Sequence, residues 1–295
     1  MKCNLCPRKC NVDRERGEIG YCEAPGKIMI ARYSLHNWEE PCISGDYGSG
    51  TIFFSYCNMK CCFCQNYQLS ELHKGRAVSI EEFSRICLEL QKSGAHNINL
   101  VTPTMYVPYI VKGLILAKKN GLVIPIVYNT SGYENVDTIK LLDGLIDIYL
   151  PDFKYYNDYK AFQYSKCSNY FKYASLAIAE MFRQVGKFQI DENGMMKKGV
   201  IVRHLLLPGN LDDSKKIISY LYQKYGDQII FSIMNQYTPV RKLEYEELNH
   251  RVVEREYDEL VNYAYDLGVR NAFIQEEGTQ QHSFIPDFDV FRAIE

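Results

Sequence analysis

Apolar and polar residues follow two different periods along most of this chain. From residue 51 onward, apolar runs of five to eight residues alternate with longer segments in which apolar residues recur every three or four positions. The runs predict buried strands, and the longer segments predict amphipathic helices. The expected strands cover residues 51–56, 98–102, 123–129, 146–150, 200–207, 229–234 and 271–275.

The expected helices lie between these strands. Residues 79–82 form a capping box that begins one helix, and Gly94 ends it. A second helix follows the strand at 98–102 and ends between residues 117 and 121. Further helices are expected at residues 136–142, 169–185, 212–225 and 252–267, and a hairpin at 189–200 with its turn at Asn193 and Gly194.

Alternating strands and helices predict parallel βαβ units and therefore an α/β fold. Six such pairs suit an open, partial (β/α)6 TIM-like barrel better than the closed barrel of eight. In barrels of this kind the functional residues lie at the carboxyl ends of the strands. We therefore look for chemistry directly after each strand.

The first 45 residues differ from the rest of the chain. They lack apolar periodicity and are rich in Cys, Arg, Gly and Pro. We expect this segment to bury little core and to depend on a metal for its fold. The expected organisation is a cysteine-rich metal-binding segment at residues 1–45 and a core domain at residues 46–295.

Charge and hydropathy exclude several classes of partner. The 34 basic and 36 acidic residues give no net field that would recruit nucleic acid or an anionic membrane. No apolar run reaches the length of a membrane span, and the first residues do not resemble a signal peptide. We expect a cytoplasmic protein.

Cysteine is the most informative residue type here. The chain has 11 cysteines, and nine of them lie in the first 64 residues. In a reducing compartment, clustered cysteines indicate metal binding rather than disulfides.

Cys57, Cys61 and Cys64 have CxxxCxxC spacing and follow the first expected strand of the barrel. Three thiolates can hold three irons of a 4Fe–4S cluster and leave the fourth iron open, whereas ferredoxin sites close all four. Cys62 adds a fourth thiol, so a structural zinc site is an alternative. Inert buried cysteines are another.

Cys3, Cys6, Cys10 and Cys22 form a second set of four thiols. Four thiolates can hold structural zinc or an auxiliary iron–sulfur cluster, and the spacing matches neither a standard ferredoxin run nor a common zinc ribbon. Cys42 lies beyond this set, and we expect it to be a buried thiol.

Residues 57–66 read CNMKCCFCQN, which resembles the C-N-x-x-C-x-[FY]-C motif of radical S-adenosylmethionine (SAM) enzymes. Among these, the chain is similar to the branch of pyruvate formate-lyase activating enzyme, and to activase-like proteins with an N-terminal cysteine segment. Residues 39–45, 48–51, 97–104 and 150–155 also resemble this subgroup.

The resemblance implies that Cys57, Cys61 and Cys64 hold a 4Fe–4S cluster whose open iron is chelated by SAM. One electron from the cluster would cleave SAM and give a 5′-deoxyadenosyl radical that abstracts a substrate hydrogen. The protein would hold the cofactors and exclude solvent. Phe63 lies in the cluster loop, where an aromatic ring can stack on adenine.

The resemblance also implies SAM contacts at the ends of later strands. Related enzymes hold the methionine amino group with Gly-Gly-Glu-Pro, where this chain has Thr102 and Thr104 without the carboxylate. Hydroxyls and carbonyls can still accept a hydrogen bond from an ammonium group.

Asn129 and Ser131 stand where the activases have Asp-Thr-Asn-Gly, and Asp152 and Lys154 match their Asp-Leu-Lys. Lys154 would pair with the SAM carboxylate. His204, in the fifth expected strand, is a further candidate for the SAM or substrate pocket.

The leading hypothesis is an activase-like radical SAM enzyme that abstracts hydrogen from a protein or peptide and receives electrons from a flavodoxin- or ferredoxin-type reductant. One alternative is radical SAM modification of a small metabolite or a ribosomal peptide. An alternative of another class is a non-catalytic zinc or iron–sulfur electron-transfer protein.

Overall fold

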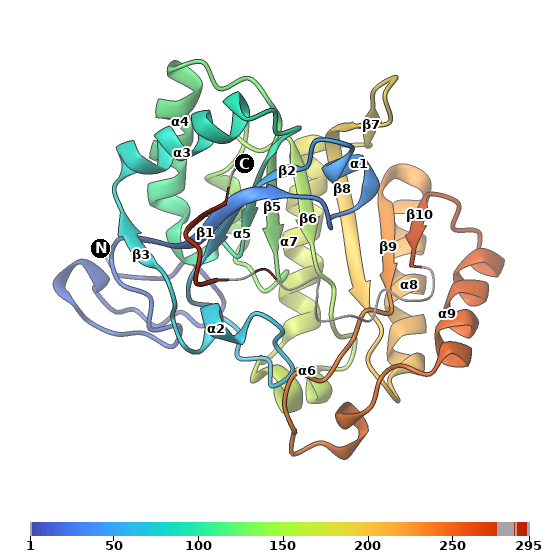
Figure 1. Ribbon diagram of the computed structural model, residues 1–295. Helices are drawn as coiled ribbons and strands as arrows, with labels where there is room; N and C mark the ends of the chain where they lie inside the picture. Colours follow the sequence, from blue (N-terminus) through green and yellow to red (C-terminus); the bar gives the residue numbers. More distant parts are fainter. Residues whose placement is uncertain (1, 276–285, 287, 294–295) are drawn as a thin grey trace.

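The computed structural model describes residues 2–275, 286 and 288–293. A central sheet is surrounded by helices, and the N-terminal segment lies at one side of it (Figure 1). The strands are β1 (Ile28–His36), β2 (Ser49–Phe54), β3 (Arg76–Val78), β4 (Ile98–Val101), β5 (Ile126–Thr130), β6 (Ile148–Pro151), β7 (Gln189–Ile190), β8 (Met196–Leu205), β9 (Ile230–Met234), β10 (Ala272–Ile274) and β11 (Arg292–Ala293).

The sheet is mostly parallel and open. Its order is β10-β9-β8-β6-β5-β4-β2-β1-β11, while β3 pairs with β1 and β7 with β8. Neighbouring strands from β2 to β10 along this path are parallel. In the described residues β10 and β11 stand at opposite ends of the path and do not pair with each other. The expected α/β partial barrel is confirmed, and each of the seven expected strands overlaps an observed one.

The helices are α1 (Pro41–Ser44), α2 (Tyr67–Ser70), α3 (Ile80–Lys92), α4 (Val107–Lys119), α5 (Val136–Lys140), α6 (Asp158–Ser165), α7 (Tyr170–Val185), α8 (Leu211–Tyr225) and α9 (Glu254–Leu267). Ser79 caps α3 as predicted, since its hydroxyl accepts the Glu82 N–H at 3.1 Å. The expected hairpin is also present, with β7 antiparallel to β8. The sequence pattern did not reveal α1, α2 and α6.

Strand β1 corrects one expectation about residues 1–45. It runs antiparallel to β2 within the main sheet, and Ile28, Ile30 and Tyr33 are buried in the core. The register shifts between Ile30 and Arg32, so the strand has a bulge that breaks the two-residue period. The segment therefore buries more core than we expected, while the division at residue 45 stays a prediction.

The two faces of the sheet bury different neighbours. Outward residues such as Leu100, Tyr128 and Val202 pack with the helices in the large core. Inward residues, among them Val127 and Ile201, form a smaller core with Cys42 and Ile43 of α1, and Cys42 is buried as expected. Polar side chains occupy the remaining inner face towards the carboxyl ends of the strands.

Candidate functional site

The cysteine triad lies on the loop between β2 and α2, at the carboxyl end of β2. Tyr56 directly precedes the triad with φ of 72°, a conformation that bulky residues rarely adopt and that occurs often at functional sites. Its ring stacks on His73 with the centroids 4.1 Å apart. The left-handed backbone at Tyr56 thus lies between the end of β2 and the first cysteine of the triad.

The three thiols lie close enough to influence one another's ionisation. Burial raises the pKa of Cys57 well above its ordinary value, and Cys61 and Cys64 raise it further. Burial also raises the pKa of Cys61 to about 12, although the Lys154 cation opposes that rise. The pKa of Cys64 is raised by burial as well. Without iron these thiols stay protonated, so iron binding must release protons.

Cys62 has a different environment from the triad. Burial raises its pKa to about 11, and its charged neighbours are Lys166, Arg241 and Glu244 rather than Lys154. Cys62 nonetheless raises the pKa of its neighbour Cys61, so it stays within electrostatic reach of the triad.

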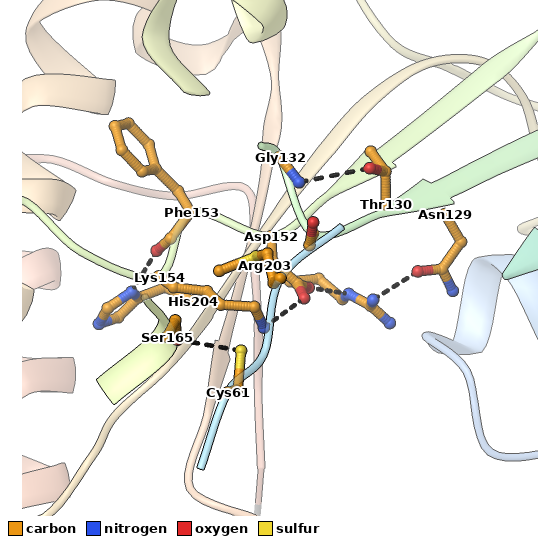
Figure 2. Close-up of polar contacts among 12 residues, drawn as sticks. Cys61, Asn129, Thr130, Gly132, Asp152, Phe153, Lys154, Ser165, Arg203 and His204 are labelled. Carbon is orange, nitrogen blue, oxygen red and sulfur yellow. Dashed lines mark hydrogen bonds and ion pairs between the residues drawn. The ribbon is translucent and has the colours of Figure 1, made fainter. Parts of the chain in front are cut away.

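Each sulfur of the triad accepts or approaches a hydrogen-bond donor. Ser165 Oγ lies 3.0 Å from Cys61 Sγ, and Ser70 Oγ lies 3.4 Å from Cys64 Sγ. The backbone N–H of Met59 points to Cys57 Sγ at 3.4 Å. Figure 2 shows the contact between Ser165 and Cys61. Donors and a nearby cation stabilise thiolates, so this set fits a cluster held by three cysteines.

A row of alternating charges lies on the inner face of the sheet near Cys61, and Figure 2 shows the part of it from Lys154 through Asp152 to Arg203. Lys154 Nζ is 2.6 Å from Asp152 Oδ2, and Arg203 Nε is 2.9 Å from Asp152 Oδ1. Arg203 also pairs with Glu39 at 3.2 Å. We call Lys154, Asp152, Arg203 and Glu39 the inner charge row. It connects the neighbourhood of Cys61 to the loop after β1.

Two amides complete the inner charge row. Arg203 donates to Asn129 Oδ1 at 2.6 Å, and Asn99 donates to Glu39 at 2.9 Å. Sequence reasoning missed Arg203, Asn99 and the role of Glu39. The signal was present, because an Arg or Asn inside an apolar strand is seldom buried without a partner.

Burial and the ion pairs within the inner charge row together set the pKa values of its members. Burial opposes ionisation of Asp152, but Arg203 and Lys154 outweigh it and lower the pKa of that carboxyl. Burial also opposes the charge of Lys154, yet Asp152 and Cys61 raise its pKa. Burial raises the pKa of Glu39 despite Arg203. Lys154 is therefore positively charged, and its charge lies beside the Cys61 thiol.

Three further residues that the sequence named as SAM contacts are Thr102, Phe63 and Ser131. Thr102 directly follows β4 and has φ of 60°, which strains a β-branched residue. The Phe63 ring is buried and packs edge-on against Tyr237 with centroids 6.0 Å apart. Ser131 Oγ is buried without a partner among the described residues, and its carbonyl accepts the Tyr170 hydroxyl at 2.8 Å.

His204 and Thr104 are not brought together with the inner charge row. His204 hydrogen-bonds the Phe153 carbonyl through Nδ1 at 2.7 Å, and burial lowers its pKa, so the ring is neutral. Thr104 donates to Glu134 Oε1 at 2.6 Å.

Glu134 is a buried carboxyl that the sequence did not single out. Hydroxyls of Thr104, Thr130 and Tyr128 all donate to its Oε1, at 2.6, 2.5 and 3.2 Å. Burial raises its pKa to about 7, although the three hydroxyls oppose that rise. No cation is among its described hydrogen-bond partners.

The N-terminal cysteines Cys3, Cys6, Cys10 and Cys22 line one small pocket, together with Thr104 and other residues of the segment. Burial raises the pKa of Cys6 to about 12 and also raises that of Cys22. Across the described ranges, no three His, Cys, Asp or Glu side chains are gathered tightly enough to hold a single metal ion.

Comparison with known proteins assigns the family. Residues 51–221 match the model of the radical SAM superfamily. The chain is 31% identical over 274 residues to the uncharacterized protein MJ0674 of Methanocaldococcus jannaschii, covering 89% of this chain and 74% of that protein. The chain therefore belongs to the radical SAM superfamily, which implies a 4Fe–4S cluster and SAM.

Solved structures of low sequence identity are also similar to this chain. HydG, a maturase of the [FeFe]-hydrogenase, matches with a TM-score of 0.50 and 14% identity, covering 89% of this chain and 55% of that one. SuiB of Streptococcus suis bound to S-adenosylmethionine matches with a TM-score of 0.48 and 15% identity, covering 76% and 49%. The chain thus spans about half the length of these structures. Among the described residues, no helix is long and apolar enough to cross a membrane.

Proposed function

We propose that Cys57, Cys61 and Cys64 hold the 4Fe–4S cluster of this radical SAM enzyme, and that SAM binds between the cluster and Lys154. The observation that carries the proposal is the grouping of these three half-buried thiols at the carboxyl end of β2, each with a hydrogen-bond donor and with the Lys154 charge beside Cys61. Cys62, in the same loop, faces other charges.

The reduced cluster, when bound, supplies the electron that cleaves SAM to a 5′-deoxyadenosyl radical. The chain's own residues bind and orient the cofactor. Lys154, held by Asp152, pairs with the SAM carboxylate, and the strained backbone at Thr102 places a carbonyl and a hydroxyl at the end of β4. Asn129 and Ser131 contribute at the end of β5, and Phe63 stacks on the adenine.

The hydrogen donor, in this proposal, is a protein or peptide, as in activating enzymes. Support comes from the open sheet, because the described strands leave the barrel unclosed between β10 and β11. An opening at the side would admit a polypeptide loop. A flavodoxin- or ferredoxin-type protein would supply the electron. The N-terminal cysteines would bind structural zinc or an auxiliary iron–sulfur cluster as a separate segment.

The test of the chemistry is anaerobic reconstitution with iron and sulfide, reduction, addition of SAM and measurement of 5′-deoxyadenosine. We expect product from the wild type and background levels from Cys61→Ala. Cys62→Ala is the matched control, since it removes a thiol from the same loop, and it should keep most of the activity. Product from Cys61→Ala at the wild-type rate would refute the ligand assignment.

The test of the substrate is deuterium transfer. Candidate proteins or peptides labelled with deuterium at glycine Cα are added to the reduced enzyme, and the 5′-deoxyadenosine is analysed for deuterium. Label from a small metabolite, and none from any polypeptide, would replace the activase-like proposal.

A further inference from the structure

Arg8 connects the two cysteine sites of the molecule. It lies in the turn between Cys6 and Cys10, where the Lys9 N–H donates to the Cys6 carbonyl at 3.1 Å. Its side chain leaves the N-terminal segment and reaches the cluster loop, where Nε donates to the Asn58 carbonyl at 3.0 Å. Asn58 follows Cys57 directly, so Arg8 holds the backbone between the first two cysteines of the triad.

The guanidinium makes two further polar contacts at the same place. One nitrogen donates to the Lys166 carbonyl, and the other approaches Cys167 Sγ at 3.4 Å. Its polar partners in the described part of the chain are thus carbonyls and a sulfur, with no carboxylate among them. Cys167 lies within electrostatic reach of both Cys61 and Cys6. The Arg8 charge therefore stands between two thiol sites that become anionic when they bind metal.

Packing also fixes Arg8 from both sides. Its guanidinium carbon lies 3.7 Å from the centroid of the Tyr21 ring and 5.3 Å from that of Tyr133. The Tyr21 N–H in turn points to Cys10 Sγ at 3.2 Å. A metal on Cys6 and Cys10 would hold the turn that carries Arg8 and also the ring that Arg8 stacks on.

The rest of the N-terminal segment is tied to the barrel independently of Arg8. Asn135 donates to the Asn4 carbonyl at 2.8 Å, and Thr138 donates to the Leu5 carbonyl at 2.7 Å. Arg14 donates to the Met105 carbonyl at 2.8 Å. Loss of Arg8 should therefore leave the segment docked.

We propose that Arg8 is a positioning residue that couples metal occupancy at the four N-terminal cysteines to the conformation and reduction potential of the 4Fe–4S cluster. The inference rests on the proposed cluster ligands Cys57, Cys61 and Cys64. Metal at the N-terminal site draws together the four thiols that line its pocket and orders the turn, the turn places Arg8, and Arg8 holds the Asn58 carbonyl while its charge favours the more negative, reduced cluster.

The first experiment measures the midpoint potential by redox titration followed with electron paramagnetic resonance. With both sites loaded, Arg8→Met should lower the reduced-to-oxidised ratio at fixed potential about tenfold, which corresponds to ~59 mV for one electron. Arg8→Lys keeps the charge and should shift the potential less. Arg241→Met is the matched control, since Arg241 donates to the Cys62 carbonyl in the same loop but pairs with Glu71. An unchanged potential in Arg8→Met would overturn the proposal.

The second experiment tests the coupling itself. Cys10→Ser keeps Arg8 but removes one N-terminal ligand, and it should shift the cluster potential in the same direction as Arg8→Met. The double variant Arg8→Met/Cys10→Ser should add little to either change. A potential that responds to Arg8→Met and not to Cys10→Ser would show that Arg8 acts without the N-terminal metal, which contradicts the coupling.

A third measurement needs no cluster. Hydrogen exchange of peptides from residues 55–66 is followed in cluster-free protein, with and without Zn²⁺ as the sole added metal. Zn²⁺ should slow exchange in the wild type and in Arg241→Met, and it should have no such effect in Arg8→Met. Equal protection in Arg8→Met would refute the coupling. Failure to assemble any cluster would instead count against the proposed function.

Discussion

The inner and outer faces of the same sheet bury charge in opposite ways. On the inner face, Asp152 sits between Lys154 and Arg203, and these two cations lower its pKa. On the outer face, Glu134 has hydroxyls alone as its described hydrogen-bond partners, and burial raises its pKa to about 7. Asp152, which has two cations beside it, therefore stays ionised near the triad, whereas Glu134, with hydroxyls as its described partners, approaches neutrality.

This difference between the two faces indicates which residues at the strand ends can bind a charged cofactor. A zwitterionic ligand needs fixed opposite charges, and the inner charge row offers them near Cys61. The outer groups, Glu134 and His204, satisfy buried hydrogen bonds between the sheet and its surroundings. We therefore expect inner-face variants to damage the chemistry and outer-face variants to change stability alone.

The largest effect is expected for Arg203→Met. The change leaves Glu39 without its cation and Asp152 with only Lys154, and breaking a buried pair costs about 3–5 kcal/mol. Urea unfolding should show this loss, and formation of 5′-deoxyadenosine should fall to background. Adding Asp152→Asn should restore part of the stability without the activity. Wild-type stability in Arg203→Met would mean that the row is not formed.

Lys154→Met is expected to reduce SAM cleavage strongly while it reduces the free energy of unfolding only moderately. Asp152 keeps Arg203 as a partner, so the free energy of unfolding should fall by no more than about 1–3 kcal/mol. SAM cleavage should fall roughly 100-fold, because a charge-assisted contact to the carboxylate is lost. Urea unfolding measures the change in stability, and isothermal titration with SAM together with product analysis measures binding and cleavage. Lys166→Met, a neighbouring exposed lysine, is the control, and a similar loss there would contradict the assignment.

Glu134→Gln should alter the pH dependence of stability. The carboxyl has a pKa near 4.5 when unfolded and about 7 when folded, so the wild type loses stability as pH rises between these values. Since one pKa unit corresponds to about 1.4 kcal/mol, that loss is on the order of 3 kcal/mol. Urea unfolding at pH 5 and pH 8 should show the variant gaining on the wild type at pH 8. A parallel pH profile would disprove the raised pKa.

The smallest effect is expected for His204→Asn. An asparagine amide can still donate to the Phe153 carbonyl, so stability should change by less than about 1.5 kcal/mol. Formation of 5′-deoxyadenosine should stay within a factor of about two. A tenfold loss of cleavage with normal folding would place His204 in the cofactor site and weaken the distinction between the two faces.

The sequence predicted much of the fold because each parallel strand is an apolar run that stands apart from its helices. It failed for β1, where a bulge interrupts the period, and for short helices such as α1 and α2, which span a single turn. It singled out His204 and missed Arg203. In a strand buried on both faces, adjacent side chains point to opposite sides, and the run itself does not say which side is inside.

The sequence by itself determined the order of the parallel strands and the longer helices along the chain, because these depend on the local hydrophobic period. The cysteine motif indicated the family. Only the tertiary structure decided that Arg203 rather than His204 joins Asp152, and that the Lys154 charge lies beside Cys61. It alone placed Arg8 on the cluster loop, 50 residues away along the chain. Such contacts depend on the order of the strands within the sheet and on the direction of each side chain. Neither is encoded by a single segment.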